Sequence, residues 1–208
     1  MPLQNRVQPT GDIIAHPSRG TLIGNRGILH DAKRTLKRRW SHPHWIVCTL
    51  HWKDVRRVPM TPNRWTELFF LDEAVALAAG HRPCAYCRRA DYRLWKAAWE
   101  HAFGERAKAA EMDGVLHASR IDKATHTQQQ HAANLADLPD GTFILHDGQP
   151  HLILGPNLLP YGSDAYALAL PKPSFKTAQV LTPAITVAVL RAGYRPVLHP
   201  TSQAGQLP

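Results

Sequence analysis

The spacing of apolar and polar residues over the first seventy positions predicts short strands. The first forty residues are divided into short apolar stretches by glycine turns. HWIVCTLHW (residues 44–52) alternates like a half-buried strand, and together with VRRVPM (residues 55–60) it predicts a β-hairpin. WTELFFL (residues 65–71) indicates a further strand. The N-terminal segment is therefore expected to be rich in β-structure.

Two helices are predicted to follow these strands. Asp72 can accept hydrogen bonds from the free N–H groups of a first helical turn, and EAVALAA has high helix propensity. Gly80 can adopt the left-handed conformation that ends a helix. A second helix is expected from Cys84 or Ala85 to about Phe103.

The second half of the chain changes from a polar to a β-rich pattern. Residues 111–140 are polar and weakly patterned, which is typical of a linker or irregular segment. From Gly141 the pattern predicts a hairpin with an Asp-Gly turn and another strand, and Thr182 can cap a last helix. We therefore predict an α+β fold with a basic domain at 1–110, a polar linker and a smaller β-rich subdomain at 141–200 packed on the first.

One short sequence pattern occurs in both halves. ALAAGHRPC at 76–84 is matched by VLRAGYRPV at 189–197, and each contains a helix end, a glycine, an aromatic ring and Arg-Pro. We interpret the pair as a repeated helix exit set by Gly80 and Gly193. An ancient duplication is the alternative.

Charge indicates the kind of partner. The 208 residues include 25 Lys and Arg against 16 Asp and Glu, a net charge of +9, and the cations concentrate in the N-terminal half. Such an excess of positive charge favours a polyanionic binding partner, and nucleic acid is the commonest polyanion. The candidate nucleic-acid-binding residues are Lys33, Arg34, Lys37, Arg38, Arg39, Arg88, Arg89, Arg93 and Lys96.

The apolar segments and the cysteine count indicate a compartment. No apolar run approaches the roughly 20 residues that a membrane span needs, and the first residues lack the apolar segment of a signal peptide. Three cysteines do not make a disulfide framework. We expect a cytoplasmic protein without a membrane partner.

The strongest chemical signal is the pair Cys84 and Cys87. C-x-x-C can hold a metal, the start of a helix favours thiolates, and structural zinc takes four ligands. Cys48 is the predicted third ligand and His81, three residues before the pair, the fourth. A redox pair and two incidental cysteines are the alternatives.

Other histidines are alternative candidates for the fourth ligand. His30, His42, His44 and His51 also lie in the N-terminal half. On a regular strand His44 would lie about 13 Å from Cys48, too far to share one ion.

Residues 64–89, RWTELFFLDEAVALAAGHRPCAYCRR, resemble the second half of the zinc-binding domain of Ada-type proteins, which repair methylated DNA. In that family an aromatic strand leads to a short helix, a Gly-aromatic-Arg-Pro-Cys-x-x-Cys turn and another helix. The resemblance implies a zinc site close to DNA. The family has two cysteines upstream of the strand, one of which accepts the methyl group, whereas this chain has only Cys48 there, so methyl acceptance is not expected.

These features lead to one principal function and two alternatives. We expect a treble-clef-like zinc module, a β-hairpin plus helices, in a protein that binds nucleic acid, DNA rather than RNA, with a role in DNA damage processing. The first alternative is a metal-dependent nuclease or other DNA-modifying enzyme using histidines outside the zinc site, such as His117, His126 and His131. The second is an enzyme with another substrate and a structural zinc. Phosphate-binding glycine loops, G-x-S-x-G and H-E-x-x-H are absent from the sequence.

Overall fold

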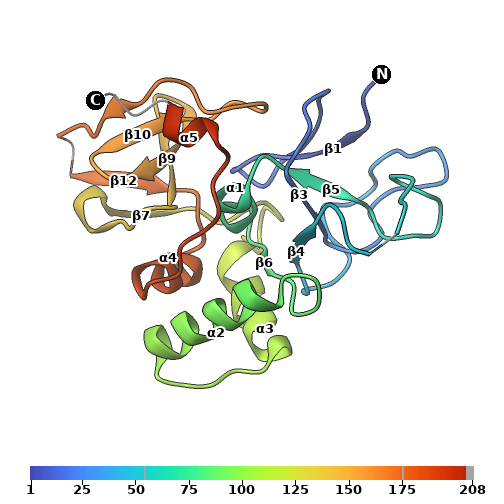
Figure 1. The fold of residues 1–208 in the computed structure, drawn as a ribbon, viewed down its shortest axis with the longest axis horizontal. Coiled ribbons are helices and arrows are strands. Elements are labelled where there is room, and N and C mark those ends of the chain that lie inside the picture. Colours follow the sequence, from blue (N-terminus) through green and yellow to red (C-terminus); the bar gives the residue numbers. More distant parts are fainter. Residues whose placement is uncertain (54, 175, 205–208) are drawn as a thin grey trace.

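Two six-stranded sheets and a group of helices form the computed structural model, which describes residues 1–53, 55–174 and 176–204. The sheets lie side by side with α1 between them, and α2, α3 and α4 lie below (Figure 1). The α+β class is therefore confirmed. None of the helices in these ranges is long and apolar enough to cross a membrane.

The N-terminal sheet has the strand order β2-β1-β5-β3-β4-β6. Parallel pairing joins β1 to β5 and β4 to β6, and the other neighbours are antiparallel. The predicted hairpin of 44–52 with 55–60 is wrong: residues 55–60 form no strand, and β4 pairs with β3 and β6 instead. The strands are β1 (Gln4–Val7), β2 (Ile13–Ala15), β3 (Leu22–Asn25), β4 (Ile46–Thr49), β5 (Leu68–Phe70) and β6 (Arg82–Pro83).

The C-terminal sheet is antiparallel, in the order β11-β10-β9-β8-β12-β7. The predicted hairpin is β8 and β9, and Asp147 and Gly148 at its turn both have positive φ. The strands are β7 (His131–Asn134), β8 (Phe143–His146), β9 (Gln149–Leu154), β10 (Asn157–Pro160), β11 (Leu170–Pro171) and β12 (Thr177–Val180).

The helices agree in part with the sequence pattern. Asp72 caps α1 as predicted, its Oδ1 accepting a hydrogen bond from the Val75 N–H. Thr182 does not cap α4, because its hydroxyl accepts the Phe143 N–H instead. The helices are α1 (Glu73–Ala78), α2 (Arg89–Phe103), α3 (Ala109–Arg120), α4 (Ala184–Arg191) and α5 (Thr201–Ala204), with a 3₁₀ turn at Leu135–Asp137.

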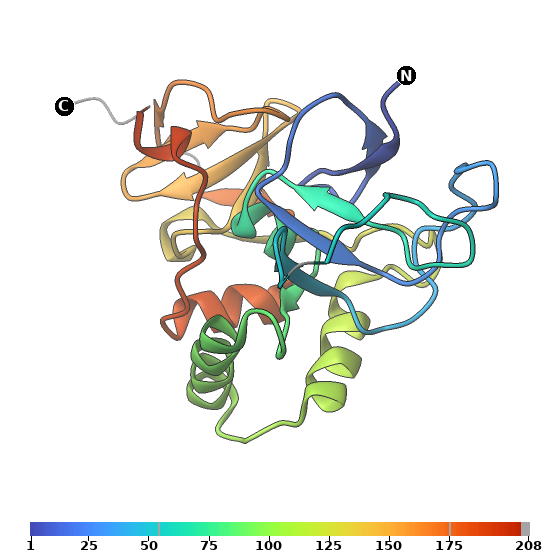
Figure 2. The same ribbon diagram turned by 45° about the vertical axis from the view of Figure 1, so that its right-hand side comes forward.

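The expected polar linker at 111–140 is wrong. Most of α3, the 3₁₀ turn and β7 lie in this segment. Met112 and Leu116 of α3 are fully buried and pack with Trp95 of α2 and Leu190 of α4. Figure 2 shows α4 beside α2, with α3 on the other side of the helical group.

A shared core joins the two predicted domains. Leu68 and Phe70 of the N-terminal sheet belong to the same buried cluster as Phe143, Leu152 and Leu181 of the C-terminal part. Folding of either sheet alone would expose one side of this cluster.

The repeated pattern forms the same helix exit twice. After α1 the Gly80 N–H bonds to the Leu77 carbonyl and the His81 N–H to the Ala76 carbonyl; after α4 Gly193 and Tyr194 do the same. This is a Schellman arrangement, which needs positive φ at the glycine, here +85° and +110°. In each copy the ring after the glycine is buried, as His81 and Tyr194 show.

Candidate metal centre

Strand register brings the three cysteines together. β4 and β6 are parallel, with Ile46 opposite Arg82 and Val47 opposite Pro83, so Cys48 and Cys84 come next in line. The Cys84 N–H continues this pairing with a 2.9 Å bond to the Val47 carbonyl.

The cysteine sulfurs form one compact cluster. The Sγ atoms of Cys48, Cys84 and Cys87 lie within 4.8 Å of one another, and this is the only group of its kind within the described ranges. Cys84 is buried, whereas Cys48 and Cys87 are half-buried. The three cysteines could therefore hold a metal ion.

Backbone N–H groups favour a thiolate at Cys84. The Tyr86 N–H donates to Cys84 Sγ at 3.4 Å. The pKa of Cys84 lies below its ordinary value, first because its sulfur accepts hydrogen bonds from the Cys48 and Cys87 thiols, and then because of the Cys87 and Tyr86 N–H groups. The pKa of Cys48 is raised correspondingly, because this thiol donates to the other two sulfurs. A negative charge is thus held where a cation would bind.

Because of the C-x-x-C turn, α2 begins at a later residue than predicted. The helix begins at Arg89 and not at Cys84 or Ala85, since residues 84–87 form the turn around the sulfurs. The Arg88 N–H bonds to the Cys84 carbonyl at 3.2 Å and leads the chain into the helix.

His81 is not part of the cluster, which corrects the predicted fourth ligand. The helix exit turns its ring inward, 4.7 Å from the Phe70 ring and 5.4 Å from the Trp45 ring, while Arg26 Nε lies 3.4 Å from its Nε2. Burial lowers the pKa of His81 well below its ordinary value, and the Arg26 charge lowers it further. His81 is therefore a neutral core residue.

The other candidate histidines also lie outside the cluster. His30 bonds Thr66 Oγ1 at 2.7 Å and His44 bonds Asp113 Oδ2 at 2.9 Å, while His51 is exposed. Within the described ranges, no histidine, aspartate or glutamate joins the three sulfurs.

The predicted basic residues divide into exposed and buried ones. Arg89 and Arg93 are exposed on α2, and Lys96 is half-buried. Arg88 is buried and forms ion pairs with Glu73 and Asp91, so its prediction as a nucleic-acid ligand is corrected. In the 31–39 loop all five candidates are exposed: Lys33, Arg34, Lys37, Arg38 and Arg39.

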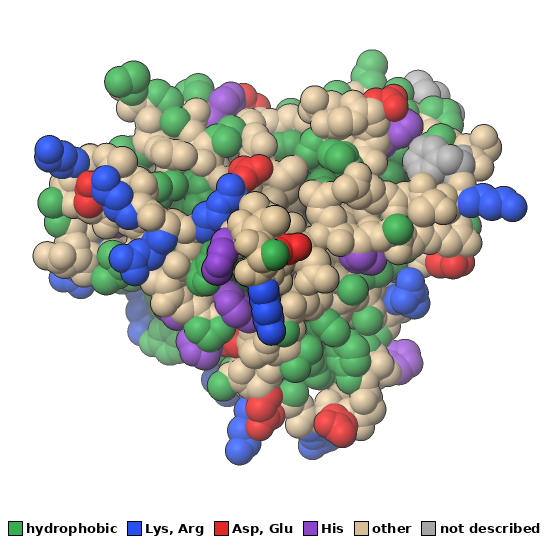
Figure 3. Space-filling view, turned by 180° about the vertical axis from the view of Figure 1, so that it is seen from behind, with side chains coloured by type: hydrophobic (Ala, Val, Ile, Leu, Met, Phe, Trp, Pro, Cys, Tyr) green, Lys and Arg blue, Asp and Glu red, His purple; other side chains and the backbone are tan. Residues whose placement is uncertain are grey.

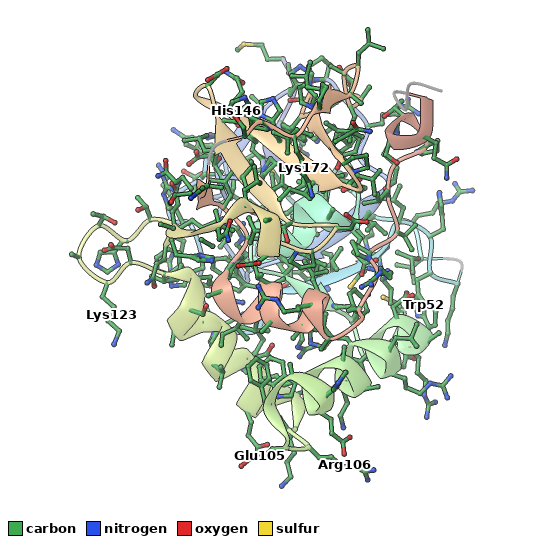
Figure 4. All side chains as sticks on the ribbon, turned by 90° about the vertical axis from the view of Figure 1, so that its left-hand side faces the viewer. Trp52, Glu105, Arg106, Lys123, His146 and Lys172 are labelled. Atoms are coloured by element: carbon green, nitrogen blue, oxygen red, sulfur yellow. The ribbon has the colours of Figure 1, made fainter. Side chains whose placement is uncertain are left out.

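An aromatic pair beside the cysteines was not predicted. The Trp52 ring lies edge-on to the Tyr86 ring with centroids 5.3 Å apart, and Lys53 Nζ lies about equally far from both, at 6.0 and 5.9 Å. Tyr86 is 67% exposed at the tip of the C-x-x-C turn. Figure 4 shows Trp52 beside the first turn of α2. The signal available in the sequence was an aromatic residue inside the C-x-x-C spacing.

A buried ion pair fastens α3 to the segment before the cysteines. Arg82 Nε and Nη2 donate to the two oxygens of Asp113 at 2.7 and 2.8 Å. Asp113 is not among the site residues predicted from the sequence, because its spacing from the neighbouring carboxylates gives no specific signal for a metal site.

No protein-family model, curated protein or solved structure matches this chain. The resemblance to Ada-type zinc domains therefore stays a prediction from residues 64–89.

Proposed function

We propose that the protein binds nucleic acid, DNA rather than RNA, through the basic surface of its N-terminal half, in which a zinc ion held by three cysteines fixes the local fold. The observation that carries the proposal is the charge distribution. Residues 1–110 contain 19 of the 25 Lys and Arg and 9 of the 16 Asp and Glu, so they carry +10 and the remainder −1. Such a difference favours a polyanion on one part of the molecule.

Zinc is the metal that best fits the cysteine cluster. Thiolates are soft ligands, and zinc is the ion most often held by cysteines in small structural sites. A strand supplies Cys48, and a turn entering a helix supplies Cys84 and Cys87. This order supports our treble-clef-like interpretation. In the cytoplasm, where we place the protein, these thiols would stay reduced.

The shape of the basic surface supports the same function. One open groove of about 400 Å³ is lined by Arg56, Arg57 and Arg64 together with the Trp65 ring. Beside the cysteines, Trp52 and exposed Tyr86 offer rings next to Lys53. Cations with interspersed rings are what proteins use to hold phosphates and unpaired bases. Damaged DNA offers both, which supports a role in damage processing.

Salt-dependent binding tests the proposal. Fluorescence anisotropy with labelled single- and double-stranded DNA and RNA should show affinity falling steeply with salt, by a slope of about 0.9 per phosphate on duplex DNA. Replacing Arg38, Arg39, Arg89 and Arg93 with alanine should weaken binding to all sequences and flatten the slope. The matched control is Lys172→Ala, since Lys172 belongs to the C-terminal part of the chain (Figure 4). Equal binding by parent and quadruple variant across the salt series would refute this surface as the interface.

A second candidate is a nuclease or other DNA-modifying enzyme that uses a histidine outside the cysteine site. His44 Nδ1 is held at 2.9 Å by Asp113 Oδ2, while the His44 side chain is 54% exposed and the Asp113 side chain 2%. A buried carboxylate that orients an exposed imidazole is an arrangement that general bases use.

The three histidines predicted within residues 111–140 have contacts of their own. His117 contacts Arg120, His126 stacks on Trp40 with centroids 6.1 Å apart, and His131 lies on β7. Incubating supercoiled plasmid with Mg²⁺ or Mn²⁺ tests this candidate: His44→Ala should abolish nicking and His126→Ala should retain it. Absence of nicking by the parent would exclude the nuclease and leave the binding function standing.

A further inference from the structure

Two buried arginines enclose one tryptophan ring. Arg26 Cζ lies 4.1 Å from the Trp45 centroid and Arg120 Cζ 3.9 Å from it, and the two arginines are 2% and 0% exposed. Their strongest hydrogen bonds go to backbone carbonyls, including those of Gly11 at 3.1 Å and Gly80 at 2.6 Å. Within the described ranges neither arginine forms an ion pair.

The nearest carboxylates already have partners. Asp113 is occupied by Arg82, and Asp12 binds Arg39 Nη1 at 3.1 Å. Four arginines in this region thus share two carboxylates, which leaves two positive charges without an anion. A buried charge without a counter-charge is costly, so the site favours an anion supplied from outside.

An open groove lies close to Arg26. It has a volume of about 430 Å³ and lies between the turn joining β1 to β2 and the end of the 31–39 loop, where Lys37, Arg38 and Arg39 line it. A smaller cavity of about 10 Å³ shares Gly11 and Arg39 with this groove and is also lined by Arg26. That volume accommodates about one water-sized atom.

One buried guanidinium N–H beside the Trp45 ring has no partner among the described residues, because Nε of Arg120 forms no hydrogen bond. Figure 3 shows Lys and Arg side chains gathered at the left of the rear view, the side on which the 31–39 loop lies. The buried positive charge of Arg26 thus lies next to a basic groove.

We propose that this groove is a phosphate-binding site of the nucleic-acid interface: one phosphate of the backbone sits at Arg39, one of its oxygens enters the small cavity toward Arg26, and Lys37 and Arg38 contact the neighbouring backbone. This inference rests on the proposed function and names the place where the backbone binds. The chemistry recognised is the phosphoryl oxyanion, whether in a nucleic-acid backbone or as free phosphate.

Replacing Asp12 tests the proposal, because the proposal predicts the direction in which the affinity should change. Its carboxylate lies in the groove and occupies Arg39. Asp12→Asn removes a negative charge that repels phosphate and frees Arg39, so binding should become tighter. Arg38→Gln removes a groove cation and should weaken binding and lower the salt slope by about one. Lys172→Gln, which removes one cation from the C-terminal part of the chain outside the proposed interface, is the matched control.

The experiment measures labelled single- and double-stranded DNA by anisotropy over a salt series, for the metal-loaded parent and the three variants. In parallel, millimolar inorganic phosphate is compared with chloride at equal ionic strength by thermal melting. Phosphate should raise the melting temperature of the parent and Asp12→Asn more than that of Arg38→Gln, and melting in chloride shows that each variant is folded.

The outcomes separate the two proposals. Opposite shifts for Asp12→Asn and Arg38→Gln support the groove. If the parent binds DNA while Asp12→Asn equals the parent, or Lys172→Gln loses as much as Arg38→Gln, the groove is overturned and the binding function stands. If the parent binds no nucleic acid but phosphate stabilises it through the groove residues, the function fails and a site for free phosphate remains. Failure of both measurements overturns both proposals.

Discussion

Replacing Asp113 with alanine should lower the free energy of unfolding by about 3–5 kcal/mol, the usual cost of leaving one member of a buried ion pair alone. The Asp113 and Arg82 side chains are only 2% and 5% exposed, and two short bonds of 2.7 and 2.8 Å join them. The substitution would leave the Arg82 guanidinium buried and unpaired. Arg120 and Arg26 carry further positive charge nearby, and Asp113 raises the pKa of Arg120 against the stronger effect of burial.

Comparison variants separate charge from shape. Asp113→Asn keeps the shape and one acceptor oxygen, so it should cost less than alanine. His44→Ala removes the exposed partner and should cost no more than about 1 kcal/mol. Arg82→Met combined with Asp113→Ala should be less damaging than the sum of the single changes, with a coupling energy of about 0.5–3 kcal/mol.

Urea denaturation of the metal-loaded protein, followed by tryptophan fluorescence, measures these free energies. A cost below about 1 kcal/mol for Asp113→Ala, with an unchanged m-value, would refute the reasoning. In that case the Arg82 guanidinium would be solvated, either by water that enters the site or after a shift of α3 that exposes it.

Three further predictions concern the metal, a buried histidine and a helix exit. Cys84→Ser, or chelation of the parent, should remove about one zinc per chain and lower the melting temperature, because structural zinc contributes folding energy; metal-free protein with unchanged melting contradicts this. The pKa of His81 is depressed in the folded state, so the neutral His81 side chain contributes fully to the free energy of unfolding above about pH 6.5, and this contribution is lost as the pH falls below that value. His81→Phe should therefore reduce the loss of stability between pH 6.5 and 5. An unchanged dependence of stability on pH would argue against this role of His81. Gly80→Ala should cost more than Gly193→Ala, because both have positive φ but the added methyl meets Arg120 Cδ at 2.5 Å only in the first case; equal costs by thermal melting would show that the arginine moves aside.

The sequence predicted those parts of the metal site that depend on local spacing along the chain. C-x-x-C with one remaining cysteine was enough to predict Cys48, Cys84 and Cys87, which the structure brings together. The parallel pairing of β4 with β6 that does this is a contact between distant segments and has no local signal. His81 was chosen for its nearness in sequence, but a left-handed glycine before it reverses the side from which its ring projects.

The missed helix has a different cause. In α3 the buried face combines Met112 and Leu116 with Asp113 and Arg120, so half of it is polar. Apolar periodicity is the main signal for an amphipathic helix, and charges on the inner face remove it. Those charges are tolerated because Arg82 and backbone carbonyls, supplied by segments far away in sequence, satisfy them. Part of the polar composition that indicated a linker thus belongs to buried residues, namely Asp113, which is ion-paired, and Arg120, which is bonded to backbone carbonyls.

The same principle decides how the basic residues should be interpreted. Arg88 and Arg89 are adjacent in the sequence, yet one is buried against Glu73 and the other faces solvent. A count of cations predicts a polyanionic partner, but it does not distinguish cations whose charge is already neutralised from those whose charge is available. The distinguishing observation is a buried carboxylate partner, since the exposed ion pairs of Lys37 with Asp31 and of Arg39 with Asp12 are weak. By that measure Arg82 and Arg88 are structural, whereas Arg26 has no carboxylate of its own and lies behind a basic groove. The charge available for a partner is therefore concentrated where buried Arg26 and the basic groove meet, and this is where the Asp12 and Arg38 variants should have opposite effects.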